Sequence, residues 1–353
     1  MGAAGARLRL ARQARGLSQQ QLAGMAGVTR QALSAIESGH SDPSLRVALA
    51  VSRALGMTVE ELFGPGDPAE PVSAVAIAAV GGPGARVALA PVGDAFVALP
   101  LSRDTTARSG FAAAGGLVAS AATDGPAIAD GEVAIEPIGP PRPTLVVAGC
   151  DPALPLLETP LALLDPPVGF AWWACSSGEA LELAERGLVH AAGTHSDGFR
   201  VPEGAEVTGF SAWREGLVLH PSVADKVSDL EDVARLGIRL VNREPGAEAR
   251  RVLDAEIERL GLDPADLPGY ETRATGHLQV AAAISAGLAG AGVASEPAAL
   301  AYDLAFIPLA DERFDLMLPA QHLGSREVQS LLRVLASPWL LAQLASIPGY
   351  QRL

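Results

Sequence analysis

Polar side chains with binding chemistry gather where the apolar segments in the second half of the sequence end. Each apolar segment has the pattern of a buried strand. Each is followed by residues with hydroxyl, thiol, amide, imidazole or guanidinium groups. Hydroxyls, helix N-termini and an Arg together suit a small anion or a polar metabolite. The candidate ligand-binding residues are Cys150, Asp151, Ser176, Ser177, Thr194, His195, Asn242, Arg243, Arg250 and Ser295.

Several of these residues also have a plainer structural interpretation. Ser176 stands three residues before Glu179, which is the spacing of a capping box. Asp151 suits the N-cap of the helix expected after it, and His195 precedes a Ser-Asp-Gly sequence typical of a turn. Either cysteine could simply be a small buried residue. The convergence of these residues at strand ends, rather than any single one, therefore supports a binding site.

A catalytic use of the same residues is an alternative interpretation. Cys175 or a cleft serine would be the nucleophile, with His195 as the base. The sequence has no nucleophile-elbow, P-loop or metal-spacing motif, and His190, His195 and His277 are not in ligand spacing. We therefore expect no catalytic residues, no metal site and no cofactor. A third possibility is an interaction scaffold that takes a peptide in the cleft.

The elements that must position the candidate residues begin at Thr144. From there strand patterns alternate with helix patterns, which is typical of an α/β fold with parallel strands. Two segments, 209–221 and 304–319, cross between two sets of strands and helices. They predict two lobes with a cleft between them, where ligands lie beyond the carboxyl ends of the strands. The expected strands are 144–150, 168–174, 189–195, 238–243 and 290–295.

The loop after the fourth of these strands is a Pro-Gly turn followed by a helix, an arrangement that can hold an anion at the helix N-terminus. Arg243 and Arg250 flank the loop and could face a carboxylate or an oxyanion. Ala247 offers no hydroxyl group there. Glu248 could stabilise its own helix dipole or face the amine of an organic ligand.

Charge is distributed unevenly along the 353 residues, whose net charge is −14. Residues 1–64 hold seven Arg and four acidic residues, a balance of +3, so the remainder carries −17. A basic segment joined to an acidic body is typical of a DNA-contacting module fused to another domain. Two cysteines cannot form a disulfide framework, and no signal-peptide or membrane-span pattern occurs. We expect a cytoplasmic, soluble protein that does not contact a membrane.

Within residues 1–64 the apolar periodicity predicts short helices joined by turns. Ser18 stands three residues before Gln21, and Thr58 three before Glu61, which are both capping-box spacings. A helix, a tight Gly turn and a second helix predict a helix-turn-helix, whose second helix reads bases in the major groove. The plainer interpretation is a helical bundle with a solvated polar face. The candidate DNA-contacting residues are Gln19, which could donate to a phosphate, and Thr29, Arg30, Gln31 and Ser34.

The stretch "LRLARQARGLSQQQLAGMAGVTRQALSAIESGHSDPSLRVALAVSRALGMTVEELF" resembles an Xre-type (phage-repressor) helix-turn-helix domain along its whole length. The elements "SQQQLA", "IESG" and "DPSL" carry the resemblance. It implies binding to a palindromic operator in double-stranded DNA, as a dimer, with the five residues just named at the DNA. Glu37 is expected to pair with an Arg of the first helix. Phosphate contacts are expected from Arg7, Arg12 or Arg46.

The middle segment, residues 65–143, has Pro/Gly-rich ends and strand patterns between them. "GPGDPAEP" (64–71) and "GPPRP" (139–143) are expected linkers. Residues 85–101 predict two strands joined by a hairpin at Gly93-Asp94, and "AAGGLVA" and "GEVAIEPI" could add further strands. The segment has no ionisable constellation, and a role in oligomerisation or signal transmission is possible.

Residues 144–350 resemble, in order, the cytosolic periplasmic-binding-protein-like domain related to molybdate-binding proteins. The motifs that carry the resemblance include "TLVVAGCDPALPLL", "GLVHAAGTHSDG", "LVNREPG" and "FIPLADERFDLMLP". This family is often fused to helix-turn-helix modules. The resemblance implies sensing of molybdate, tungstate or another small ligand.

One loop departs from the family pattern, which usually has Gly-Ser-Gly-Thr-Arg after the strand that ends in Asn-Arg. Here Arg250 remains, but Ala247 and Ala249 replace the hydroxyl residues and Glu248 stands at a Gly position. Molybdate recognition would then depend on hydroxyl groups of the first lobe, namely Ser176, Ser177 and Thr194.

The sequence therefore predicts a multidomain protein. It would have an all-α helix-turn-helix domain at 1–64, a linker and small β-rich module at 65–143, and an α/β two-lobed periplasmic-binding-protein-like (type II) domain at 144–353. The predicted function is a ligand-responsive DNA-binding transcriptional regulator, a homodimer whose effector is an oxyanion such as molybdate or tungstate. A sensor of a small organic metabolite with the same architecture is the alternative.

Overall fold

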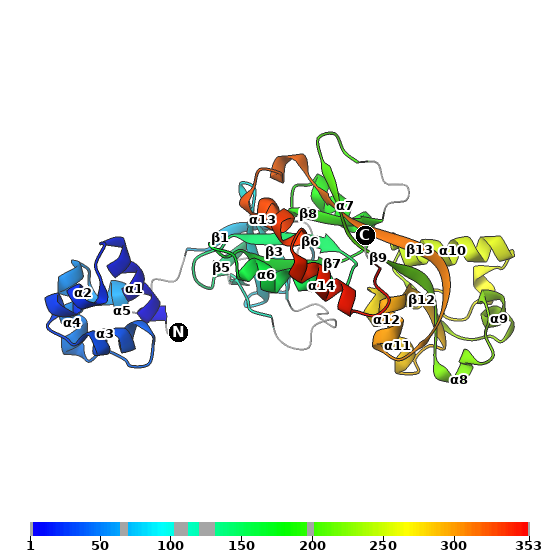
Figure 1. Ribbon diagram of the computed structural model, residues 1–353, viewed down its shortest axis with the longest axis horizontal. Coiled ribbons are helices and arrows are strands. Elements are labelled where there is room, and N and C mark those ends of the chain that lie inside the picture. The colour runs from blue at the N-terminus through cyan, green and yellow to red at the C-terminus, as the bar shows by residue number, and fades with distance from the viewer. Residues whose placement is uncertain (1–2, 64–69, 102–111, 120–130, 196–200, 352–353) are drawn as a thin grey trace. The chain divides into compact units, whose positions relative to one another are not determined.

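The computed structural model describes residues 3–63, 70–101, 112–119, 131–195 and 201–351. The chain divides into two compact units, Met1–Glu70 and Pro71–Leu353. Figure 1 shows the first unit as a group of helices in blue and the second as a mixture of strands and helices in cyan to red. Most of the linker expected at 64–71 lies outside the described residues.

The first unit consists of short helices around a small apolar core. Their bounds are α1 (Ala3–Ala14), α2 (Gln19–Ala26), α3 (Arg30–Glu37), α4 (Leu45–Leu55) and α5 (Val59–Phe63). Helices of this length are marginal in isolation, so their apolar faces must pack together to be stable. The buried core includes Leu8, Leu22, Leu33, Ile36, Val51, Leu55 and Leu62.

The predicted helix starts in this unit are confirmed, because the expected side chains form the capping hydrogen bonds. Ser18 accepts a hydrogen bond from the N–H of Gln21, whose side chain accepts from the N–H of Ser18. A second capping box begins α5. Between α2 and α3, Gly27 has a φ of 66°, a left-handed conformation that glycine adopts without strain. Thr29 then caps α3.

The second unit begins with a closed barrel in the strand order β1-β3-β2-β4-β5. Its strands are β1 (Val72–Ala76), β2 (Arg86–Val92), β3 (Ala95–Pro100), β4 (Gly116–Val118) and β5 (Glu132–Pro137). The predicted hairpin is confirmed, because β2 pairs with β3 up to Val92 opposite Ala95. The sequence patterns did not predict β1, which closes the barrel by pairing with β3 and β5.

The rest of the unit is built on one eight-stranded sheet in the order β11-β10-β12-β9-β13-β8-β6-β7. Its strands are β6 (Thr144–Gly149), β7 (Gly169–Ala174), β8 (Ala191–His195), β9 (Glu206–Leu219), β10 (Leu240–Arg243), β11 (Arg273–Ala274), β12 (Ala291–Ser295) and β13 (Ala305–Leu318). The expected crossings are the long strands β9 and β13, which pair with each other along their length. Both run antiparallel to their neighbours, so the sheet as a whole is mixed, whereas the expected parallel pairing holds within each set of strands.

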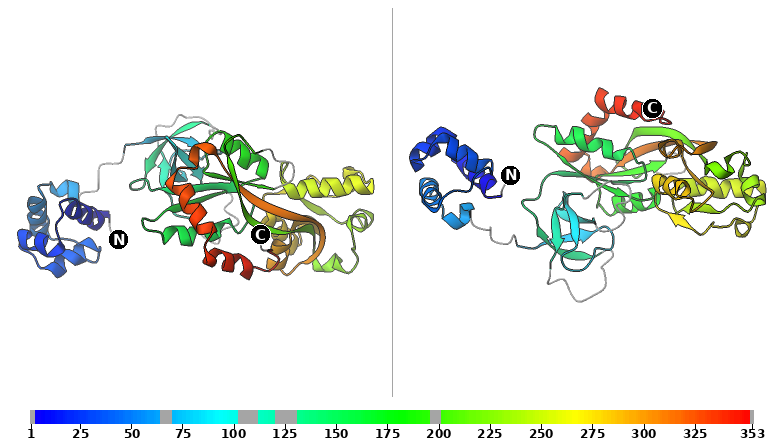
Figure 2. Two further views of the ribbon diagram at one scale, coloured as in Figure 1. Left: turned by 45° about the horizontal axis from the view of Figure 1, so that its top comes forward. Right: turned by 90° about the horizontal axis from the view of Figure 1, so that it is seen from below.

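The two crossing strands join two lobes, which Figure 1 shows at opposite ends of β9 and β13. The first lobe has the parallel strands β6, β7 and β8, and the second has β10, β11 and β12. Figure 2 shows the same division from two other directions. The helices of the first lobe are α6 (Glu158–Ala162), α7 (Ser177–Glu185), α13 (Arg326–Leu335) and α14 (Pro338–Ser346). Those of the second are α8 (Pro221–Ala224), α9 (Leu230–Arg235), α10 (Glu248–Leu260), α11 (His277–Ser285) and α12 (Glu296–Ala301).

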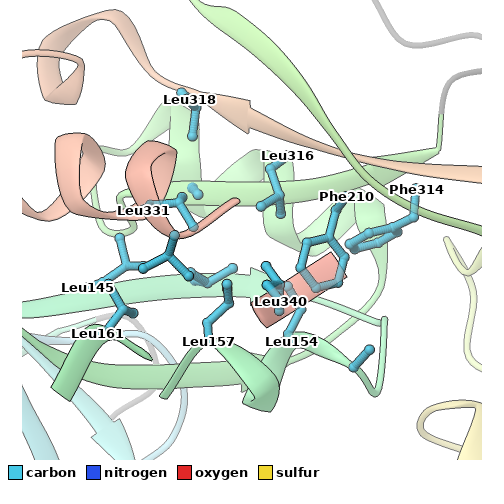
Figure 3. Close-up of a cluster of buried hydrophobic side chains, with 14 of the residues drawn as sticks. Leu145, Leu154, Leu157, Leu161, Phe210, Phe314, Leu316, Leu318, Leu331 and Leu340 are labelled. Atoms are coloured by element: carbon cyan, nitrogen blue, oxygen red, sulfur yellow. The ribbon is translucent and has the colours of Figure 1, made fainter. Parts of the chain in front are cut away.

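Each lobe has its own apolar core, and the crossing strands contribute to both. In the first lobe Phe210 of β9 and Phe314 of β13 pack edge to face over leucines of the 3₁₀ helix Leu154–Leu157 (Figure 3). At the other end of β9, Leu217 and Leu219 lie in the core of the second lobe. The barrel packs on the first lobe through a further cluster that includes Ile77, Val92, Val97, Val146 and Ala148. In the described part of the chain, no helix has the length and apolar character needed to cross a membrane.

Candidate functional site

The exposed face of α3 carries the residues expected to read DNA. Thr29, Arg30 and Gln31 are exposed and Ser34 is half-buried, whereas the opposite face of the helix lies in the core of the unit. Thr29 has a structural role as well, since its Oγ1 accepts a hydrogen bond from the N–H of Ala32 at 3.1 Å. Contacts of this face with DNA stay a prediction.

A buried ion pair holds α3 against α1. Nε and Nη2 of Arg12 donate to the two carboxylate oxygens of Glu37 at 2.6 and 3.0 Å, and Nη1 donates to the carbonyl of Leu17 at 2.7 Å. The expected pairing of Glu37 with an Arg of the first helix is confirmed. Arg12 therefore has a structural role, and the expected phosphate contacts from Arg7, Arg12 or Arg46 stay a prediction. Gln19 also donates to Glu37, at 2.9 Å, which leaves one of its two amide N–H groups for a phosphate.

In the second unit a small pocket lies where strands of both lobes end. The first lobe contributes Cys150, Pro152, Trp172, Ala174 and Cys175, and the second contributes Arg243, Glu244 and residues 275–279. The volume of this pocket is about 20 Å³. One water needs roughly that volume. The lobes therefore lie close together around the site and leave little space between them.

Arg243, at the end of β10, supplies this pocket with a buried cation. Its side chain is 1% exposed, and Nε and Nη2 donate to Glu244 at 2.8 Å each. Burial alone would raise the pKa of Glu244, but the hydrogen bond and the charge of Arg243, with smaller contributions, together lower that pKa. Nη1 has no hydrogen-bond partner among the described residues. A buried donor without an acceptor costs free energy, so this nitrogen is suited to a ligand oxygen.

His277, the first residue of α11, offers a second donor in the same pocket. Its Nδ1 lies 3.2 Å from the backbone nitrogen of Ser295. Burial alone would lower the pKa of His277, but Glu215 and Cys150 raise it to about 9, so Nε2 carries a proton. Nε2 has no partner among the described residues. Glu215 lies 3.5 Å from Nδ1 and accepts a hydrogen bond from Trp213 at 3.0 Å. Arg243 and His277 thus place two buried donors in the lining of one pocket, and His277 also interacts with the thiol of Cys150.

A thiol, an imidazole and a carboxylate form a buried chain on the first-lobe side of the pocket. Sγ of Cys150 lies 3.5 Å from Nε2 of His195, and Nδ1 of His195 lies 2.9 Å from a carboxylate oxygen of Glu312. Burial alone would raise the pKa of Cys150, but the hydrogen bonds and positive charges of His195 and His277 together outweigh it and lower that pKa to about 6. Burial likewise opposes the charge on His195, but Cys150 and Glu312 raise its pKa to about 10. The two shifts act in the same direction, and both favour the thiolate–imidazolium form of the pair.

Two glycines allow this chain to form. A Cβ on Gly149 would lie 3.0 Å from Cζ of Phe314, and one on Gly193 would lie 2.1 Å from the same atom. Gly149 also has a φ of 154°. The Phe314 ring therefore fits only over glycine at both positions, and its edge-to-face contact with His195, at 5.6 Å between centroids, helps to orient the imidazole.

Three interpretations of single residues need correction. Asp151 is not a plain N-cap: it is fully buried and accepts from Ser211, Tyr350 and the N–H of Ala153, and burial raises its pKa. His195 does not sit in a turn but ends β8, and residues 196–198 lie outside the described residues. The alternative pairing of Cys175 with His195 is also wrong. His195 bonds Cys150 instead, and burial raises the pKa of Cys175 well above its usual value.

The remaining predicted residues lie outside the lining of the small pocket. Ser176 caps α7 by accepting from the N–H of Glu179 at 3.3 Å, as its spacing predicted, and lines a larger neighbouring pocket of about 400 Å³. The hydroxyls of Ser177 and Ser295 are buried, with no partner among the described residues. Thr194 donates to the carbonyl of His195 at 3.2 Å.

Asn242 and Arg250 support the second lobe. The amide of Asn242 donates to the carbonyl of Tyr270 at 3.1 Å and accepts from the N–H of Arg243 at 2.8 Å. Arg250 donates to the carbonyl of Arg243 at 3.3 Å, and its guanidinium lies 4.8 Å from the centre of the Tyr270 ring. Both residues therefore hold the end of β10 and the start of α10 in place.

Comparison with known proteins assigns both units. The sequence matches the PBP superfamily domain over residues 160–336, half of the chain. The chain belongs to the PBP superfamily. Residues 8–62 match a helix-turn-helix family, so an Xre-type DNA-binding domain precedes the PBP-like domain. In the described part of the chain, no group of three or more His, Cys, Asp and Glu side chains could hold a metal ion.

The chain is similar to several proteins over parts of its length. It is 32% identical to YvgK of Bacillus subtilis over 138 residues, 39% of this chain and 44% of that protein. It is 43% identical to the HTH-type transcriptional regulator MJ0272 of Methanocaldococcus jannaschii over 47 residues, 13% of this chain and 71% of that protein. Among solved structures, a phosphate-bound transporter substrate-binding protein from Clostridium perfringens has 14% identity and a TM-score of 0.46, covering 60% of this chain and 99% of that one. The controller protein C.AhdI from Aeromonas hydrophila has 40% identity and a TM-score of 0.17, covering 17% and 91%.

Four residues around the pocket of the PBP-like domain were not among the predicted site residues. Trp213 and Glu215 lie on β9, Glu312 lies on β13, and His277 begins α11. The crossing strands were recognised as connections only, so their side chains were not considered for the site. A signal was present in "WRE" and "DERF", since charged residues inside an apolar crossing strand must find partners where the strand is buried.

Replacing Glu312 by Gln is expected to raise the pKa of Cys150 from about 6 toward the ordinary thiol value. The carboxylate stabilises the imidazolium that in turn stabilises the thiolate, so its loss weakens both charges. Thiolate absorbance measured against pH would show the shift, and Cys150→Ser identifies the signal that belongs to this thiol. Glu206→Gln, at an exposed position on β9, is the matched control. An unchanged titration in Glu312→Gln would contradict the assigned chain.

Proposed function

We propose that this protein is a ligand-responsive transcriptional regulator that binds operator DNA as a homodimer. Its PBP-like domain would sense a small ligand that carries acceptor oxygens. The proposal places the protein in the cytoplasm, with the DNA, and assigns it no catalytic turnover. The observation that carries the ligand assignment is Arg243, a buried guanidinium in the small pocket with one nitrogen lacking a partner among the described residues.

The chemistry of the donors favours an oxyanion or a carboxylate. Nη1 of Arg243 and Nε2 of His277 are the two donors available to a ligand oxygen, and both residues line the same pocket. The second lobe has Ala247 and Ala249, both buried, where hydroxyl donors would suit molybdate. Molybdate and tungstate are therefore test compounds, compared with small carboxylates, and neither is assumed to be the effector.

Coupling to DNA binding requires that the ligand favour one arrangement of the lobes. A ligand with equal affinity for the open and closed arrangements would change nothing. β9 and β13 are the strands that cross between the lobes, so bending within them would alter the distance between Arg243 and the first-lobe side of the pocket. The barrel packs on the first lobe and directly follows the DNA-binding unit in sequence, which supports it as the element that transmits this change.

A saturating ligand should raise the melting temperature of the PBP-like domain, and Arg243→Gln should remove most of that rise. At a ligand concentration of about one hundred times Kd, stabilisation is about 2.7 kcal/mol, which corresponds to a shift of about 5 °C or more. Thermal melts with molybdate, tungstate, phosphate, acetate and glyoxylate would measure it. Arg259→Gln removes a similar Arg–Glu pair from the same lobe at an exposed position and should respond as the native protein does. The same rise in Arg243→Gln would count against this binding site.

A further inference from the structure

The pocket contains a reactive group that simple anion binding does not use. Cys150 lines the pocket, and its sulfur contacts His195, which Glu312 holds from the other side. A thiol next to an imidazole that a carboxylate orients is the arrangement that activates a cysteine as a nucleophile. His195 and Glu312 are 4% and 9% exposed, so solvent screens the chain little.

We propose that Cys150 captures the ligand covalently, and that the ligand is a small oxo acid, an aldehyde or ketone that also carries a carboxylate. The sulfur would add to the carbonyl carbon, while Arg243 and His277 hold the oxygens. This inference rests on the proposed function, because it names the ligand class of the same pocket. Formation of a hemithioacetal is reversible, which suits a sensor that must release its effector.

Two features of the pocket favour this class over other electrophiles. The planar guanidinium of Arg243 matches a carboxylate, and its unpartnered Nη1 is buried in the lining that also contains Cys150. The pocket volume is about 20 Å³, so ligands of few atoms need the smallest separation of the lobes. A bulky aromatic or long-chain electrophile would require a much wider cleft.

The reaction balances without a further reactant. The thiolate sulfur of Cys150 forms a bond to the carbonyl carbon of the oxo acid. The π pair of the carbonyl moves to its oxygen, which takes the proton from Nε2 of His195. The products are a hemithioacetal that keeps the negative charge of its carboxylate and a neutral imidazole that still bonds Glu312 through Nδ1. Release of the ligand reverses each of these transfers.

Cys175 lines the same pocket and serves as an internal comparison. Burial raises its pKa well above the ordinary thiol value, and neither histidine is among the groups that shift it. Cys175 should therefore stay a protonated thiol at neutral pH and add poorly to a carbonyl.

The test uses the full chain and ¹³C-labelled glyoxylate, the smallest aldehyde that carries a carboxylate. A new tetrahedral-carbon resonance should appear with the native protein and be absent in Cys150→Ser. In parallel, iodoacetamide alkylation of each cysteine at neutral pH is followed by peptide mass spectrometry. Cys150 should react faster than Cys175, and glyoxylate should slow its reaction. Glycolate, which has the carboxylate but no carbonyl, should protect much less.

His195→Gln should slow alkylation of Cys150 about tenfold or more, because the thiolate loses its counter-ion. Glu312→Gln supplies a second, milder variant if His195→Gln does not fold. Equal protection by glycolate and glyoxylate without the new resonance would overturn covalent capture while leaving anion sensing intact. Equal reactivity of the two cysteines would overturn the activated thiol. The melting temperature of Cys150→Ser with and without anions tests the proposed function separately. A rise with anions in this variant would show anion sensing without covalent capture.

Discussion

Replacing Arg30 and Gln31 together by alanine is expected to abolish operator-specific binding while leaving the fold unchanged. Both side chains lie on the exposed face of α3 and contribute nothing to the core of the DNA-binding unit. Each bidentate contact to a base contributes about 1–3 kcal/mol, so the pair should cost about 2–6 kcal/mol. The affinity for the operator would then fall by at least about thirtyfold.

The operator for this measurement can be selected from random DNA with the native protein. Quantitative footprinting at constant salt then compares the double variant with the native protein on the operator and on unrelated DNA. Binding to unrelated DNA should change little, because phosphate contacts supply it. Arg53→Ala, an exposed change of the same charge on α4, is the matched control. An unchanged footprint in the double variant would show that α3 is not the reading helix.

Glu37→Gln is expected to have the largest effect on stability. Glu37 is completely buried, and its two oxygens accept from Arg12 and Gln19. The substitution leaves the guanidinium of Arg12 largely buried without its counter-charge, which costs about 3 kcal/mol. Small units such as this one have only about 3–9 kcal/mol of total stability, so most of it could be lost.

Amide hydrogen exchange in the full chain can measure this effect in the DNA-binding unit alone. Exchange of the α1 and α3 amides should accelerate about a hundredfold, while the PBP-like domain keeps its rates. Glu60→Gln, at an exposed position in α5, is the control. If Glu37→Gln exchanged like the native protein, the buried pair would not stabilise the unit.

The same pair makes the stability of this unit depend on pH. Burial alone would raise the pKa of Glu37, but hydrogen bonds from Arg12 and Gln19 outweigh it and lower that pKa. A lowered folded-state pKa means that the stabilisation is present above the ordinary carboxyl pKa and is lost as pH falls through the folded value. Acid should therefore destabilise the native unit, and Glu37→Gln should lack this step.

The architecture could be predicted from the sequence because its signals are local. Capping residues, Gly turns and apolar periodicity act over three or four residues, and they identified the helix-turn-helix and the strand–helix alternation. The crossing segments 209–221 and 304–319 were found in the same way. The strand β1 was missed, because a five-residue segment of small residues has no distinctive pattern until it pairs within the barrel.

The site depended on contacts that no local pattern contains. Cys150 and Arg243 were predicted and do line one pocket, but their partners come from distant segments. Glu312 is 117 residues from His195, and the antiparallel register of β13 against β8 brings them together. Asp151 looked like an N-cap from its neighbours, yet Tyr350, 199 residues away, is one of the groups that hold its carboxylate.

By itself, the sequence determined that a helix-turn-helix domain precedes an α/β domain of the PBP type, and it identified which residue types stand at the strand ends. Only the tertiary structure decided which of those residues share a pocket, and that Cys150 rather than Cys175 has an imidazole beside it. The physical reason is the distance over which each effect acts. Helix and strand propensities are set by neighbours in the chain, whereas the pKa of a thiol is set by charges within a few ångströms in space.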